Sequence, residues 1–85
     1  MAYHVKLFTL RSTTNDTFML VNPDQVEMTS ITRNEDGEWS VMIVQSHHMI
    51  RFNIPEDKLE KLKDALRGTE GIDLDAEYLV MDAHG

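Results

Sequence analysis

The sequence contains no cysteine, and that absence removes several classes of chemistry at once. It excludes a disulfide framework, a thiol nucleophile and every zinc or iron–sulfur site that uses cysteine ligands. The chain has 85 residues, so we predict a single domain over residues 1–85. A domain of this size buries only about 60–65% of its unfolded surface. Small domains without disulfides or metals often gain stability by association, so we expect a homo-oligomer.

Long apolar runs are also missing. None approaches the ~20 residues that a membrane-spanning helix requires. The opening segment MAYHVKLFTL carries Lys6 inside its apolar stretch, whereas a secretory leader places basic residues before that stretch. We therefore expect a soluble, cytoplasmic protein that does not bind membranes.

Positive charge is scarce, and the formal net charge is −7. Residues 1–68 carry ten acids and eight bases, whereas residues 69–85 carry five acids and no base. Because nucleic-acid binding depends on clustered Lys and Arg, we do not expect direct binding to nucleic acid. A protein partner with a basic surface is the better electrostatic match.

Motifs of catalysis are absent as well. The four glycines, at 37, 68, 71 and 85, form neither a phosphate-binding loop nor a G-x-S-x-G elbow. The serines and threonines of RSTTNDT lack an evident base and oxyanion donor. The acid pairs Glu35/Asp36 and Asp73/Asp75 do not have the spacing of a calcium loop. We predict a noncatalytic protein without a metal or cofactor.

Two adjacent histidines, His47 and His48, lie between apolar runs in MIVQSHHMIRFNIP. In a hairpin, Ser46-His47 forms the tip, and both imidazoles lie at an exposed end of the sheet. In one unbroken strand they would point to opposite faces and could not chelate one ion. A zinc site needs three or four ligands, and the remaining histidines, His4 and His84, lie near the two ends of the chain. The pattern favours a solvated turn. The remaining functional interpretation is a partner-facing patch of His47, His48 and Arg51.

Alternating apolar and polar residues predict that residues 1–54 are mainly β. The predicted strands cover 3–10, 17–21, 26–33, 39–45 and 48–54. Asn22-Pro23 predicts a bend and Asp36-Gly37 predicts a hairpin turn. In strand 26–33, Ile31 is out of phase with Met28, which indicates either a bulge near 29–30 or an edge strand with an outward Ile31.

Strand 39–45 is apolar on both faces. Trp39, Val41 and Ile43 share one face, and Met42 and Val44 share the other. A strand of this kind needs a helix on one face, and a second sheet layer or a second copy of the chain on the other.

A helix is predicted over 55–67. Pro55 suits its first position, Leu59, Leu62 and Leu66 form an apolar stripe, and Gly68 suits its end. The acidic segment that follows, 69–85, is too apolar to be disordered. Its residues 72–82 fit either a strand or a helix capped by Asp73, and we favour the helix. The predicted fold class is α+β: a small curved antiparallel sheet of four or five strands, the helix, and the ordered acidic segment.

The run from Thr17 to Leu66 resembles the small FlbD-type proteins encoded among bacterial flagellar genes. The residues that carry the resemblance are Phe18, Leu20, Asn22, Pro23, Asp24, Val26, Glu27, Val41–Val44, Ile50–Ile54 and the helix from Glu56. The sequence departs from that pattern at the Ser46-His47 hairpin, at Pro55 and in the acidic tail. The resemblance implies a noncatalytic accessory protein of bacterial or phage origin that acts through its surface.

Three functions are compatible with the sequence. The first is a regulatory, self-associating protein-binding module. The second is a phage-encoded inhibitor whose acidic surface mimics nucleic acid and occupies a basic groove on a host protein. The third is a nucleotide-sequestering protein with its ligand at a subunit interface. Predicted partner contacts are Asp73, Asp75, Glu77, Tyr78, His47, His48 and Arg51. Predicted ligand contacts for the third function are Arg11, Arg33, Arg51 and Trp39.

Overall fold

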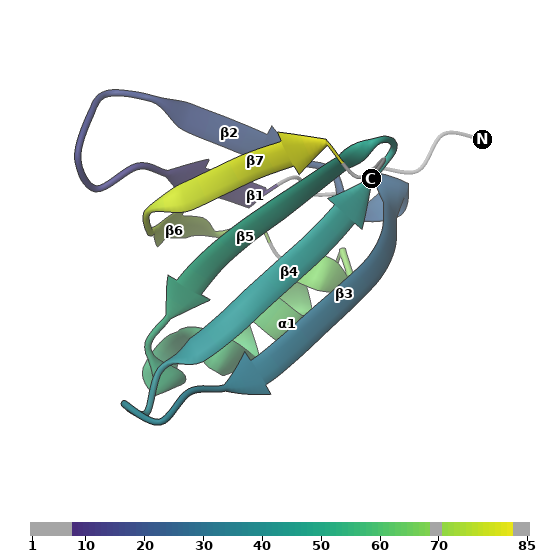
Figure 1. Cartoon of the computed structure of the whole chain (residues 1–85). Helices are drawn as coiled ribbons and strands as arrows, with labels where there is room; N and C mark the ends of the chain where they lie inside the picture. Colours follow the sequence, from purple (N-terminus) through teal and green to yellow (C-terminus); the bar gives the residue numbers. More distant parts are fainter. Residues whose placement is uncertain (1–7, 69–70, 83–85) are drawn as a thin grey trace.

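The computed structural model describes residues 8–68 and 71–82, and Figure 1 shows how they are arranged. The label η denotes a short 3₁₀ turn. The elements are β1 (Phe8–Arg11), β2 (Phe18–Val21), η1 (Pro23–Gln25), β3 (Val26–Arg33), β4 (Trp39–Gln45), β5 (His48–Ile54), η2 (Glu56–Lys58), α1 (Leu59–Leu66), β6 (Asp73–Asp75) and β7 (Tyr78–Asp82). The described residues do not include His84 or residues 3–7 of the first predicted strand, among them His4.

The strands form two sheets. The larger has the order β3-β4-β5-β7 and is antiparallel throughout. The smaller has the order β2-β1-β6, with β1 antiparallel to β2 and parallel to β6. The α+β class is therefore confirmed. The described residues contain more strands than the predicted four or five, because the acidic segment adds β6 and β7. The two predicted strands β1 and β2 pair with β6 in a separate sheet.

The helical region begins with a 3₁₀ turn. Pro55 has an extended backbone and precedes the helical region, so it is not the first helical residue. The α-helical part is limited to Leu59–Leu66. It ends as predicted, with Gly68 at a φ of +77° and its amide bonded to the Ala65 carbonyl at 3.0 Å.

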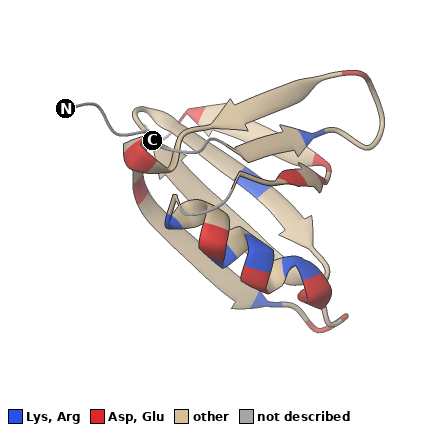
Figure 2. Ribbon diagram, turned by 180° about the vertical axis from the view of Figure 1, so that it is seen from behind, with Lys and Arg blue, Asp and Glu red and all other residues tan. Residues whose placement is uncertain are grey.

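Helix α1 and the smaller sheet lie on the same side of the larger sheet (Figures 1 and 2). The core between them draws on every strand except β3 and β7. Its buried members are Phe8, Leu10, Val21, Val41, Ile43, Ile50, Phe52, Ile54, Leu62, Ala65, Leu74 and Ala76. Burial of the alternate residues 41, 43, 50, 52 and 54 confirms the predicted inward face of β4 and β5.

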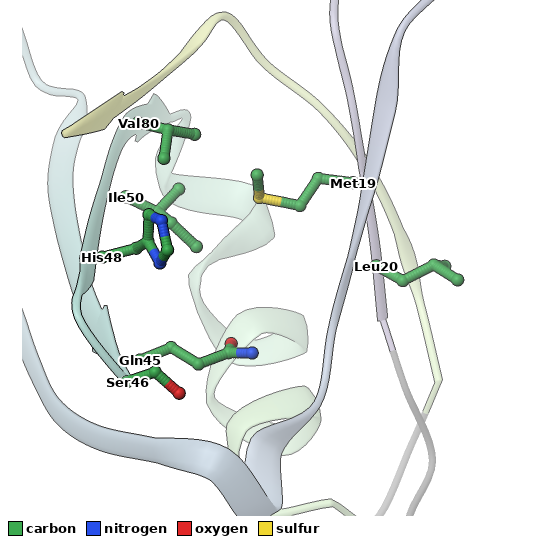
Figure 3. A pocket seen from close by; sticks show the side chains of 7 residues that line it. All are labelled: Met19, Leu20, Gln45, Ser46, His48, Ile50 and Val80. Carbon is green, nitrogen blue, oxygen red and sulfur yellow. The ribbon is translucent and has the colours of Figure 1, made fainter. Parts of the chain in front are cut away.

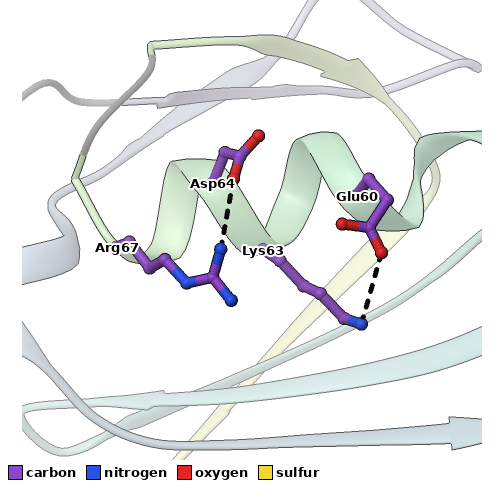
Figure 4. Close-up of polar contacts among 4 residues, drawn as sticks. All are labelled: Glu60, Lys63, Asp64 and Arg67. Atoms are coloured by element: carbon purple, nitrogen blue, oxygen red, sulfur yellow. Dashed lines mark hydrogen bonds and ion pairs between the residues drawn. The ribbon is translucent and has the colours of Figure 1, made fainter.

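The solvent-facing side of α1 carries both signs of charge (Figure 2). Glu60 pairs with Lys63 at 3.5 Å and Asp64 with Arg67 at 3.3 Å (Figure 4). Ion pairs between exposed side chains contribute little. The helix is therefore held on the sheet by its buried side, which contains Leu62 and Ala65.

The prediction of a helix over 72–82 was wrong. Asp73–Asp75 forms β6 beside β1, and Tyr78–Asp82 forms β7 at the edge of the larger sheet. The alternation of buried Leu74 and Ala76 with exposed acids has the period of a strand. Both partner strands are more than twenty residues away along the chain, so the local pattern could not identify them.

The irregularity in β3 lies earlier than predicted. The pairing of β3 with β4 shifts between Val26 and Met28, which places Val26 opposite Gln45 and Met28 opposite Val44. Ile31 then lies opposite the buried Val41 and is itself half-buried. The bulge therefore turns Met28, not Ile31, toward the outside.

The β4–β5 hairpin has a two-residue turn, Ser46-His47, because Gln45 pairs with His48. Ser46 has a φ of +56°, a conformation that costs an L-residue with a side chain about 1 kcal/mol. Ser46→Gly relieves this strain but adds the conformational freedom of glycine to the unfolded chain, so it should raise the free energy of unfolding by roughly 0.5 kcal/mol or less, measured by urea denaturation. Ser40→Gly, within β4 where φ is negative, should instead lower it by about 0.5–1 kcal/mol. Equal effects of the two substitutions would contradict this explanation.

Candidate functional site

The outer face of the larger sheet, the face opposite α1, carries a row of apolar residues that crosses all four strands. The pairings Met28–Val44, Val44–Met49 and Met49–Met81 place these four side chains next to one another. Neighbouring cross-strand residues on one face are close enough to touch. We call this set of Met28, Val44, Met49 and Met81 the methionine row.

A second row lies beside it, two residues further along each strand. It consists of Ser30, Met42, Arg51 and Leu79, which are successive cross-strand partners. The third row, Thr32, Ser40 and Asn53, is polar. The outer face is therefore apolar toward the β4–β5 hairpin and polar toward the opposite end.

No described element covers the outer face. In Figure 1 no described element lies in front of β3, β4 and β5, and α1 lies behind them. Met28 and Leu79 are 53% and 59% exposed, while Met42, Val44, Met49 and Met81 are half-buried. Isolated exposed apolar residues are normal on a protein surface, but a contiguous group of them marks an interaction site.

Arg51 is the only charged residue in these three rows. It lies between Met42 and Leu79, and it forms no ion pair with another described residue. Its long aliphatic stem can pack against both neighbours while the guanidinium stays in water. The outer face thus presents an apolar surface and one cation.

The predicted acidic contacts have partners within the chain. Arg11 lies 3.6 Å from Asp73 and 3.5 Å from Asp75, and all three side chains are at least half exposed. These pairs add little stability, but they offset part of the negative charge of β6. Asp73 and Asp75 are therefore partly neutralised by Arg11.

Glu77 is fixed by the loop between β1 and β2. Its Oε1 accepts hydrogen bonds from the Ser12 hydroxyl at 2.5 Å and the Thr13 amide at 3.2 Å. Its Oε2 accepts one from the Thr14 hydroxyl at 2.6 Å. The Ser12 hydroxyl, followed by that of Thr14, holds the pKa of the Glu77 carboxyl below its usual value of 4.5.

The lowered pKa of Glu77 predicts a pH-dependent contribution to stability. The contribution is fully present above the unfolded-state pKa of 4.5 and is lost as the pH falls through the lower folded-state pKa. Glu77→Gln should therefore lower Tm near pH 7, and the difference from the wild type should shrink in acid. Glu35→Gln, at an exposed hairpin position, is the control and should leave Tm unchanged. A Tm difference for Glu77→Gln that stays constant down to acidic pH would contradict the assignment.

The remaining predicted ligand contacts are spread over the molecule. Arg11 is on the smaller sheet, Arg33 ends β3 at 4.0 Å from Glu56, and Arg51 is on the outer face. Trp39 is half-buried opposite Ile54. The structure does not bring the three arginines together around one anion site.

The predicted histidine patch is also divided. His47 is in the turn, and His48 lies on the opposite face of β5 from Arg51. Tyr78 is half-buried, and its hydroxyl lies 3.4 Å from Thr17 Oγ1. Within residues 8–68 and 71–82, no three His, Asp or Glu side chains are close enough to hold a metal ion.

His48 instead lines a pocket of about 400 Å³ between the two sheets (Figure 3). The lining residues are Met19, Leu20, Gln45, Ser46, His48, Ile50 and Val80. This pocket was not predicted from the sequence, because its walls come from β2, the β4–β5 hairpin and β7. The outer face was partly visible in the sequence, through Met42 and Val44 on the second face of strand 39–45.

Comparisons with known proteins add no further assignment: no family model, no curated protein and no solved structure matches the chain. The resemblance to FlbD-type proteins therefore stays a prediction. In the part of the chain that the structure describes, no helix is long and apolar enough to cross a membrane.

Proposed function

We propose that the chain is a noncatalytic regulatory module that binds protein through its outer face, and that this face first pairs with a second copy of the chain. The observation that carries the proposal is the methionine row, which crosses all four strands and is covered by no described element. Burying it against another apolar surface removes that surface from water.

A second copy fits this face because the methionine row is uncharged. In a two-fold interface the same patch is used on both sides, so the patch must be complementary to itself. A row of three methionines and a valine meets that condition, because apolar side chains pack against their own kind without unpaired charges. Methionine is flexible and adapts its shape to an apposed surface.

Arg51 does not prevent this pairing. If the two-fold axis runs along the methionine row, the two copies of Arg51 lie one row away from it in opposite directions. Adjacent rows are two residues apart along a strand, so the two guanidinium groups are about 14 Å apart along the strand direction. That separation exceeds the screening length of about 8 Å at physiological salt, so their repulsion is small.

Met28→Glu, within the methionine row, tests the pairing. Two-fold symmetry introduces the carboxylate twice into the apolar interface, and this should weaken the dimer by roughly tenfold or more. Sedimentation velocity over a concentration series measures the effect. The matched control is Phe18→Glu, which changes a residue of similar exposure (62% against 53%) that also lies on an edge strand, but of the other sheet.

We expect the wild type and Phe18→Glu to dimerise alike, and Met28→Glu to need a roughly tenfold or higher protein concentration to form the same fraction of dimer. A monomeric wild type at every concentration would refute self-association. Equal dimerisation of the two variants would place the interface elsewhere on the molecule.

A further inference from the structure

We infer that the pocket between β2 and the larger sheet binds a small, uncharged, mainly apolar molecule that carries one hydrogen-bond donor. This site is separate from the outer face, because Ile50 and Val80 project from the opposite side of β5 and β7. The inference therefore goes beyond the proposed protein-binding function.

The body of the pocket is apolar. Met19 reaches from β2 toward Ile50 and Val80, which project from the facing sheet (Figure 3). The pocket has a volume of about 400 Å³, which falls in the range of pockets that hold small molecules. Val80, 40% exposed, lies at its rim, so the pocket is open to solvent.

One end of the pocket is polar and has an unmet hydrogen-bonding requirement. Gln45 lines the pocket, and its Oε1 is buried with no hydrogen-bond partner among the described residues. Buried carbonyl oxygens are nearly always hydrogen-bonded, because leaving one unpaired is destabilising. A hydroxyl or amide N–H of a ligand would supply the missing donor, with Ser46 and the His48 ring beside it (Figure 3).

The lining also specifies the charge of the ligand. It contains no Lys, Arg, Asp or Glu, so an ammonium group would find no ion-pair partner there. Its one titratable side chain, His48, is exposed to water, where an ion pair with a carboxylate contributes little. Moving an unpaired charge into an apolar pocket is strongly unfavourable. A neutral alcohol or amide meets both conditions, because it combines an apolar body with a single donor.

The test uses 1-hexanol and hexyl methyl ether, two probes that share an apolar chain but differ in the donor. Each is titrated into the ¹⁵N-labelled full-length protein and followed by the amide shifts of Ser46, His48 and Val80. We expect saturable shifts at these residues and about fivefold tighter binding of the alcohol, the gain typical of one neutral hydrogen bond.

Gln45→Met retains the length of the side chain but removes the acceptor, so it should abolish the preference for the alcohol. Gln25→Met makes the same substitution at an exposed position outside the pocket and should preserve it. Absence of saturable shifts would overturn the inference, and so would an undiminished preference in Gln45→Met. If Gln45→Met does not fold, the affinities of the wild-type protein for the alcohol and the ether are decisive. Equal affinities would show that Gln45 accepts no hydrogen bond from the ligand.

Discussion

Leu74→Ala should lower the free energy of unfolding by about 3 kcal/mol, the usual cost of removing a fully buried leucine side chain. Leu74 is 2% exposed, at the centre of β6 and opposite Leu10 of β1. Although it lies in the acidic segment between Asp73 and Asp75, it closes the core under the smaller sheet. Urea denaturation followed by circular dichroism measures the loss.

Phe18→Ala is the control for Leu74→Ala. It removes a larger side chain from the same sheet, but Phe18 is 62% exposed, so the expected change is within about 0.5 kcal/mol. A small effect of Leu74→Ala would mean that the acidic segment is not part of the core and that β6 is dispensable.

Leu62→Ala should also cost about 3 kcal/mol, because Leu62 is fully buried where α1 packs on the core. The α-helical part has only eight residues, and an isolated helix of that length is unstable in water. Its persistence therefore depends on the buried side, and the same substitution should speed hydrogen exchange throughout Leu59–Leu66.

Lys63→Ala separates packing from surface charge in the same helix. It breaks the exposed Glu60–Lys63 ion pair shown in Figure 4 and should cost about 0.5 kcal/mol or less. Comparable losses from Leu62→Ala and Lys63→Ala would show that the ion pairs, rather than the core, hold the helix in place.

Local signals in the sequence were sufficient for the central part of the fold. The predicted strands 26–33, 39–45 and 48–54 coincide with β3, β4 and β5. The two turn signals behave as predicted: Gly37 and Gly68 both have positive φ. These features depend on neighbouring residues, so periodicity and turn chemistry can identify them.

The strands of the acidic segment and the pocket depend on contacts between residues that are distant in the sequence. The alternation of residues 72–82 is compatible with two structures, and only pairing with β1 and β5 selects strands. The pocket joins residues from three separate segments, so no single stretch of sequence contains its signal.

Prediction of the whole outer face from the sequence would have required one further fact, the position of the bulge in β3. Without the shift at Val26/Met28, Met28 would share the inward face with Val26, and the methionine row would lack its first member. The sequence did place Met42 and Val44 opposite the buried face of strand 39–45, which is the part of the outer face that a period of two reveals.

Isotope-filtered NOE spectroscopy tests the proposed pairing most directly. Protein with ¹³C-labelled methionine methyl groups is mixed with unlabelled protein, so that only contacts between copies give cross-peaks. The proposal predicts cross-peaks from Met28, Met49 and Met81 of one copy to the outer face of the other. Cross-peaks confined to Met19, on the inner side of β2, or none at a concentration where sedimentation shows a dimer, would contradict it.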